Sequence, residues 1–245
     1  FFFLFFFFND TATTEIYTLS LTTLFRSRLK KFANKKKIKF LCSAFDLDSL
    51  NYLKKIKLSE IKIPSGEINN IQYLKYIRKF AKKVIISTGM STIEEIDKAY
   101  KIINKKITSK NIAILHCVSI YPTDIEKLNL NNILMLKKRY NLKIGLSDHT
   151  TSLFAPSIAV ALGAEIIEKH FTINKNLKGP DHFMSLNPSE FKKMVSLVRS
   201  TERSMGSYKR ILTKKELELK KYARKSVVAK NLIKKGEIFS LKNLT

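Results

Sequence analysis

The chain has 245 residues, enough for one α/β barrel or two small domains, and its hydrophobic content of 44% is ordinary for a globular protein. No segment approaches the roughly 18 consecutive apolar residues that span a bilayer. The net charge of +26 comes from 38 lysines and only 8 arginines, set against 20 acidic residues and spread along all but one of the predicted helices. This pattern is typical of solvated helix faces and favours an anionic small substrate, while a nucleic-acid-binding protein remains an alternative.

The start of the chain differs in character from the rest. Residues 1–8 are a phenylalanine-rich run, and the first methionine is Met90. Residues 9–27 show no helical or strand period that continues into the following sequence. We therefore predict that residues 1–27 are a non-native leader resembling translated sequencing-adapter read-through.

From residue 37 onward, short apolar runs alternate with amphipathic stretches. The apolar runs predict strands at 38–44, 60–63, 84–87, 112–118, 143–146 and 164–171. The amphipathic stretches predict helices at 49–57, 70–82, 92–104, 125–139, 153–163 and 188–205. This order without hairpin signals predicts a parallel α/β sheet, and its length favours a TIM-type (β/α)8 barrel that is incomplete, with about six β/α units present. An open doubly wound sheet is the alternative, although no glycine-rich phosphate loop follows any strand.

The two cysteines, Cys42 and Cys117, fall inside predicted strands and lack any metal or redox spacing. We interpret them as reduced, buried core residues, which is typical of a cytoplasmic protein.

Polar side chains follow each predicted strand, where a barrel would gather them on one rim. They include Ser65-Gly66-Glu67, Ser87, Ser119 with Tyr121, Ser147 with His149, and Glu168 with His170. Two of the four histidines thus follow neighbouring strands, and neutral imidazole is a common ligand of divalent metals, although two structurally satisfied histidines are an equal alternative on spacing alone. Lys62 is a charge inside an apolar strand, and an anion at the barrel mouth explains its placement.

Six motifs in this order resemble the sialic acid (N-acetylneuraminate) synthase family, which includes legionaminic and pseudaminic acid synthases. They are KIPSGE (62–67), ISTGMS (86–91), LHCVSIYPT (115–123), GLSDHT (145–150), EKHFT (168–172) and GPDHFMSLNP (179–188). Further on, YARKSVVA (222–229) and IKKGE (233–237) resemble the opening of that family's antifreeze-like (SAF) domain.

The resemblance implies a transferase that condenses phosphoenolpyruvate with an N-acetylated amino sugar, N-acetylmannosamine or an analogue, and releases phosphate. It implies His149 and His170 as ligands of a divalent ion, Mn²⁺ or Mg²⁺. It assigns phosphoenolpyruvate binding to the side chains Lys62, Ser87, Ser119 and Ser147. Glu67, with Lys62, would be catalytic, and sugar binding falls to Tyr121, Glu168 and Asp181. Without the resemblance, Glu67 could stabilise a helix start, Tyr121 could pack a loop and Asp181 could cap a turn.

The resemblance also implies a domain plan for the chain. Residues 28–208 would be the incomplete barrel, 209–221 a linker, and 222–245 the start of a truncated SAF domain. We expect the first two barrel strands to be missing and this fragment to be inactive, whereas the full-length parent would be a cytoplasmic, domain-swapped homodimer. The alternatives are an N,N'-diacetyllegionaminate or pseudaminate synthase and, from another class, a non-catalytic carbohydrate-binding remnant. One sequence does not reveal the acceptor sugar or the preferred metal.

Overall fold

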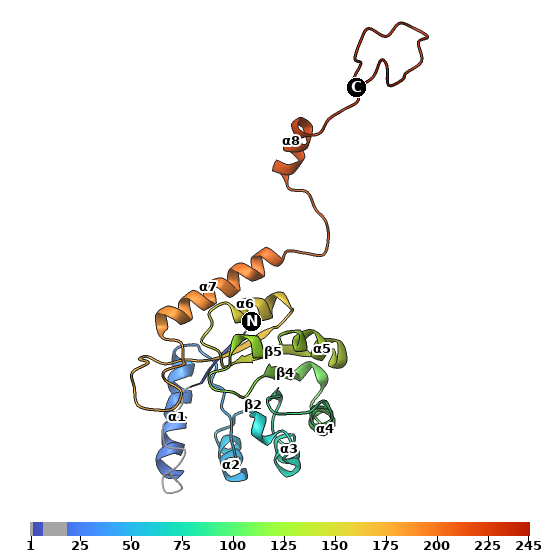
Figure 1. Cartoon of the computed structure of the whole chain (residues 1–245). Coiled ribbons are helices and arrows are strands. Elements are labelled where there is room, and N and C mark those ends of the chain that lie inside the picture. Colours follow the sequence, from blue (N-terminus) through green and yellow to red (C-terminus); the bar gives the residue numbers. More distant parts are fainter. Residues whose placement is uncertain (1, 7–18) are drawn as a thin grey trace. The chain divides into compact units, whose positions relative to one another are not determined.

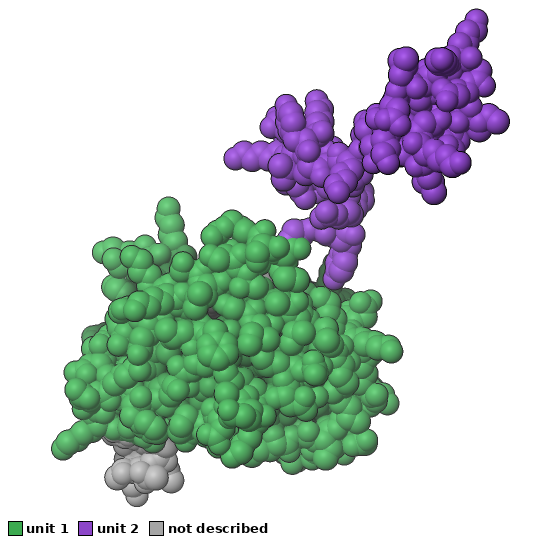
Figure 2. Space-filling model, turned by 45° about the horizontal axis from the view of Figure 1, so that its top comes forward, with its two compact units in different colours: residues 1–205 green, residues 206–245 purple. Residues whose placement is uncertain are grey.

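The computed structural model describes the backbone of residues 2–6 and 19–245 and the side chains from residue 27 onward (Figure 1). It divides into two compact units, residues 1–205 and 206–245 (Figure 2). The first unit holds the sheet and every predicted site residue. The second holds helix α8 (Lys214–Ala223), which begins in the predicted linker and ends two residues beyond it, and an antiparallel bridge between Ala229 and Leu244. Within the described part of the chain, no helix is both long and apolar enough to cross a membrane.

The first unit is built on a curled, entirely parallel sheet with the strand order β1-β6-β5-β4-β3-β2. Its strands are β1 (Phe2–Phe6), β2 (Glu60–Ile63), β3 (Lys83–Ser87), β4 (Ile112–Cys117), β5 (Lys143–Asp148) and β6 (Ile166–His170). Strands β2 to β6 follow one another in both sequence and space, as successive β/α units require. The prediction of an incomplete barrel of the α/β class is confirmed.

Helices connect the strands and cover one face of the sheet (Figure 1). They are α1 (Leu19–Lys35), α2 (Leu47–Lys55), α3 (Ile71–Ile77), α4 (Ile93–Asn104), α5 (Asn131–Tyr140), α6 (Ala155–Ala161) and α7 (Pro188–Met205). Three short 3₁₀ turns are η1 (Ser65–Glu67), η2 (Ser109–Asn111) and η3 (Ile125–Lys127). Capping residues mark where the α-helices begin. Asp46 caps the start of α2, and Thr92 with Glu95 forms a capping box at the start of α4.

Two predictions about local structure are wrong. Residues 38–44 form no strand. They contribute only a single bridge, from Cys42 to Ile61, and no continuous ladder of hydrogen bonds to β2. Cys42 is accordingly only half-buried, whereas Cys117 is buried, and both are free thiols.

The predicted leader overlaps regular structure at two places. Strand β1 pairs in parallel with β6, with Phe2 opposite Ile166, and α1 begins at Leu19. Residue 1 and residues 7–18 of the leader lie outside the described part. The foreign origin of this segment stays a prediction.

The two faces of the sheet have different chemistry because successive strand residues point to opposite sides. The face toward the helices is apolar, and it carries Ile61, Ile63, Val84, Ile86, Ile112, Ile114, Ile144, Leu146 and Ile167 of the main core. The opposite face has only a small apolar cluster at its base, Ala113, Leu115 and Ile166. Above this cluster, towards the carboxyl ends of the strands, the same face carries polar side chains. The pleat therefore places the predicted site residues of the strands together inside the curled sheet.

Candidate active site

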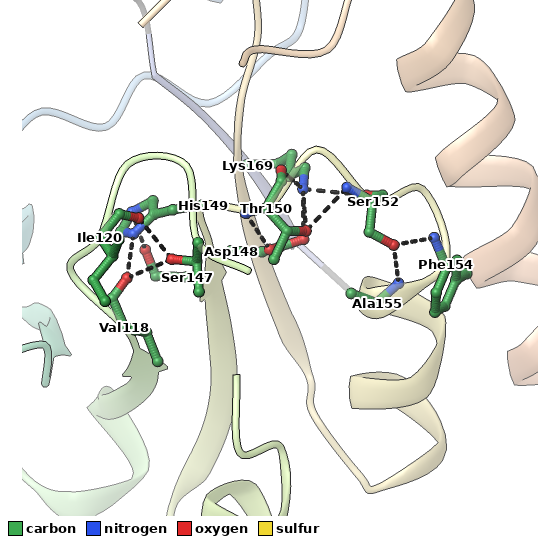
Figure 3. Close-up of polar contacts among 11 residues, drawn as sticks. Val118, Ile120, Ser147, Asp148, His149, Thr150, Ser152, Phe154, Ala155 and Lys169 are labelled. Carbon is green, nitrogen blue, oxygen red and sulfur yellow. Dashed lines mark hydrogen bonds and ion pairs between the residues drawn. The ribbon is translucent and has the colours of Figure 1, made fainter. Parts of the chain in front are cut away.

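Two imidazoles meet at the carboxyl ends of β5 and β6. The ring centroids of His149 and His170 are 5.3 Å apart, with the ring planes inclined at 75°. The Nδ1 atom of His149 lies 2.7 Å from the carbonyl oxygen of Val118 (Figure 3). Because a carbonyl can only accept, Nδ1 carries the proton and donates it, which leaves the Nε2 lone pair of His149 available.

The loop after β4 holds His149 from both sides. While His149 donates to Val118, its own carbonyl accepts a hydrogen bond from the Thr123 amide at 3.0 Å. The Thr123 hydroxyl donates to the carbonyl of Ile120 at 2.6 Å, which closes the loop. The imidazole is thus oriented by a segment of the neighbouring β/α unit.

Both imidazoles are in the form that binds a cation. Burial lowers the pKa of His149 below its ordinary value. Burial also lowers the pKa of His170 to about 3, and the charge that His149 carries when protonated, with those of Lys169 and Lys62, adds to the effect. At neutral pH both rings are therefore uncharged, which metal ligation requires.

A buried ion pair lies next to the imidazoles. The ammonium of Lys62 is 3.2 Å from Oε1 of Glu168, and both side chains are almost completely buried. The Ser147 hydroxyl donates to the same Oε1 and lies 3.4 Å from Nε2 of His149. The second carboxylate oxygen, Oε2 of Glu168, has no hydrogen-bond partner among the described residues. Lys62, Ser147, Glu168 and His149 therefore form one connected polar group, as the strand-end pattern predicted.

A group of hydroxyls and one thiol continues the polar surface across β2, β3 and β4. Ser65 accepts a hydrogen bond from the Gly89 amide at 3.0 Å and donates to the thiol of Cys117, which also contacts Ser119. A Cβ atom at Gly89 would lie 2.0 Å from Oγ of Ser119 and 2.8 Å from Oγ of Ser65. Only glycine lets these hydroxyls approach the backbone so closely. Ser87, at the end of β3, is buried, and its hydroxyl has no hydrogen-bond partner within the described ranges.

The rule of polar residues after strands included Ser65 but gave it no role, and it did not include Cys117. Cys117 was interpreted as a core residue, yet the strand alternation places it on the polar face.

The remaining predicted residues lie in loops. Tyr121 stacks on His149 with centroids 4.2 Å apart and meets His170 edge-on at 5.8 Å. Desolvation raises the pKa of Tyr121 to about 12, and the charges of Glu168 and Asp181 contribute, which brings Asp181 into the electrostatic environment of the site. Glu67 lies in η1, where its carboxylate accepts a hydrogen bond from Asn70 at 2.8 Å. Its contacts therefore favour neither the predicted catalytic role nor the helix-start alternative alone.

The imidazole pair fits a divalent ion in ligand type, and His149 also fits it in tautomer. No group of three or more His, Cys, Asp or Glu side chains within the described part of the chain is arranged to hold a metal. Two imidazoles would therefore leave the other coordination positions to water and substrate, which is the open arrangement that catalytic ions need.

Known proteins are similar to this chain in sequence and in fold. A sequence model described as the NeuB family matches residues 9–210. The N,N'-diacetyllegionaminic acid synthase of Campylobacter jejuni is 43% identical over 97% of this chain and 72% of its own length. A pseudaminic acid synthase of Campylobacter jejuni is 40% identical over 89% of this chain and 63% of its own length. The crystal structure of an N-acetylneuraminic acid (sialic acid) synthetase from Leptospira borgpetersenii, in complex with citrate, superposes with a TM-score of 0.76 at 37% identity, covering 82% of this chain and 70% of that one. The chain therefore spans about two thirds of the length of such relatives.

Proposed function

Because the chain belongs to the NeuB family, we propose that the protein from which it comes condenses phosphoenolpyruvate with an N-acetylated amino sugar to give a nonulosonic acid. The methylene carbon of phosphoenolpyruvate would form a bond to the aldehyde carbon of the open-chain sugar. Water would add to the carbon that carries the phosphate, and phosphate would leave. The connected group of Lys62, Ser147, Glu168 and His149 is the observation that supports this proposal most directly.

Lys62, Ser147, Ser87 and Ser119 would bind the phosphate and carboxylate of phosphoenolpyruvate. An ammonium and three hydroxyls are donors suited to anionic oxygens. The Ser87 hydroxyl, buried and without a hydrogen-bond partner in the described part, has a donor to offer such a ligand. Lys62 could serve an arriving anion by sharing its donors between that anion and Glu168.

Tyr121, Glu168 and Asp181 would bind hydroxyl or N-acetyl groups of the sugar. Glu168 lies beside Lys62 and Ser147, so its carboxylate stands where the two substrates would meet. Glu67 would transfer the proton and stabilise the cationic carbon that forms after attack, and Lys62 would contribute to catalysis by holding the anionic groups of phosphoenolpyruvate. His149 and His170 would hold Mn²⁺ or Mg²⁺, which as a Lewis acid polarises the sugar aldehyde.

The acceptor sugar is the open part of this proposal. Relatives named as legionaminic, pseudaminic and sialic acid synthases each match more than four fifths of this chain. We take N-acetylmannosamine as the main candidate and the sugars of the other two synthases as the alternatives. A non-catalytic, carbohydrate-binding remnant is the candidate of another class. We further propose a cytoplasmic location and a homodimeric full-length protein with an SAF domain, and we expect residues 1–245 alone to be inactive.

The test uses the full-length gene product with phosphoenolpyruvate, Mn²⁺ and a panel of 2-acetamido sugars, and it measures phosphate release. At least one sugar should support release, and His149→Ala or His170→Ala should abolish it together with Mn²⁺ binding. Absence of release with every sugar would refute the enzymatic proposal. The same assay on residues 1–245 checks whether this part is inactive by itself.

A further inference from the structure

A second buried ion pair lies directly behind the imidazoles, on the helix-facing side of the sheet. Lys169 and Asp148 are opposite each other in the β5–β6 register, and they are 1% and 0% exposed. The Lys169 ammonium is 2.6 Å from Oδ2 of Asp148. Each residue adjoins a predicted metal ligand, since His149 follows Asp148 and His170 follows Lys169.

The Lys169 ammonium also gathers the loop that follows β5 (Figure 3). It lies 2.5 Å from the carbonyl oxygen of Thr150, 3.3 Å from the Thr150 hydroxyl and 3.2 Å from the carbonyl oxygen of Ser152. The other oxygen of Asp148 accepts the amide of Thr150 at 2.9 Å. His149 therefore lies between Asp148, which belongs to the ion pair, and Thr150, whose backbone is hydrogen-bonded to both members of the pair.

The tie extends to the start of α6. The Ser152 hydroxyl accepts the amides of Phe154 and Ala155 at 3.2 and 3.1 Å. One ammonium thus joins the end of β6, the end of β5, the intervening loop and, through Ser152, the next helix. The geometry fixes the backbone under both imidazoles at once.

Stability alone does not account for a buried ion pair at this place. The cost of removing two charges from water often cancels their attraction, and well-packed apolar residues of similar size can be equally stable. What apolar residues cannot supply is a donor that converges on the carbonyls of Thr150 and Ser152. This points to a role in geometry.

We propose that Lys169 and Asp148 are positioning residues that hold the His149 imidazole in its Nδ1-protonated orientation, ready to share a divalent ion with His170. The metal part of this inference rests on the proposed function. The orientation part concerns the metal-free chain and can be tested separately. Residues that orient metal ligands typically change metal affinity 10- to 100-fold when removed.

The experiment compares the parent chain with Lys169→Met and with the double variant Lys169→Met/Asp148→Leu, which replaces both charges by apolar side chains. Lys175→Met is the matched control, because it removes a lysine from a different ion pair, with Glu190 in α7. Urea unfolding shows whether each variant is folded, and the double variant covers the case in which the single one is not. The first readout is the ¹⁵N spectrum of the imidazoles without metal, and the second is Mn²⁺ affinity by calorimetry.

The expected result is a single His149 tautomer in the parent and the control and a mixture of tautomers in the folded Lys169 variant. Mn²⁺ affinity should fall at least tenfold in that variant and stay within about twofold of the parent in the control. An unchanged His149 tautomer in a folded chain that lacks Lys169 would overturn the inference. If the parent binds no Mn²⁺ but the tautomer mixture still appears, the positioning role is supported and the metal part of the proposed function is refuted.

Discussion

Replacing Glu168 by Gln tests whether the Lys62 ammonium is a binding site for anions. The substitution removes the carboxylate charge 3.2 Å from Lys62 but keeps the size of the side chain. Breaking a buried ion pair by neutralising one partner typically costs about 3–5 kcal/mol, since the remaining charge stays in a region of low polarity. We expect the free energy of unfolding to fall by about 3 kcal/mol, the lower end of this range, because the amide oxygen of Gln can still accept the hydrogen bond from Ser147.

Binding of an anion at Lys62 should restore the stability that Glu168→Gln loses. If inorganic phosphate binds at Lys62, the variant gains about 2.7 kcal/mol when phosphate is present at 100 times its dissociation constant. The parent should gain less, because in it the phosphate must share Lys62 with the Glu168 carboxylate. The folded variant is thus expected to bind phosphate and phosphoenolpyruvate more tightly than the parent, even if its catalytic turnover falls.

Urea unfolding followed by circular dichroism, with and without phosphate at constant ionic strength, measures both effects. Glu165→Gln is the matched control, because it neutralises a carboxylate three residues earlier, at the amino end of β6, and should change little. Lys62→Met should remove the phosphate response. If phosphate stabilises the parent, Glu168→Gln and Lys62→Met equally, an anion site at Lys62 is refuted. If Glu168→Gln without phosphate is as stable as the parent, the ion pair contributes nothing to stability.

Three other perturbations have expected outcomes. Gly145→Ala should cost about 3 kcal/mol or prevent folding, measured by urea unfolding, because the new Cβ would lie 2.4 Å from the backbone oxygen of Ile166. Gly89→Ala should cost only about 1 kcal/mol, since the hydroxyl of Ser119 can rotate away, but phosphate affinity by calorimetry should fall at least tenfold. The pKa of His170, about 3, lies below its ordinary 6.5, so its contribution to stability is complete above pH 6.5 and is lost as the pH falls toward 3. His170→Asn should therefore flatten the decline in unfolding free energy between about pH 6.5 and 5, and an identical decline in the parent would contradict the lowered pKa.

The order of elements from β2 to α7 could be predicted from apolar runs and capping residues. The run at 38–44 shows the limit of that reasoning. Apolar composition indicates burial but does not identify a hydrogen-bonding partner, and in the structure only Cys42 bridges to the edge strand β2. Conversely, β1 lies in a segment whose composition suggested no strand, and its pairing with β6 is a long-range contact that local patterns do not contain.

Part of the candidate site could be predicted because side chains at strand ends converge by geometry. The contacts of Lys62, Ser147 and Glu168 agree with that expectation. The interaction partner of each group could not be predicted, since the sequence contains no information on the distance between Lys62 and Glu168. It therefore suggested a lysine waiting for an anion, where the structure has a lysine already matched with a carboxylate.

The pair of Asp148 and Lys169 shows how a site at a barrel mouth also constrains the opposite face of the sheet. When Ser147 and Glu168 point into the mouth, the pleat turns the next residues toward the helices. Apolar side chains there would fill the space but leave the carbonyls of the β5–α6 loop without their donor, and an unsatisfied buried carbonyl costs about 1–3 kcal/mol. A lysine satisfies them only if its own charge is balanced, which Asp148 does across the strand pair. The need to hold the loop that begins with His149 thus accounts for both charges, and it couples the orientation of the imidazole to a residue pair on the opposite face.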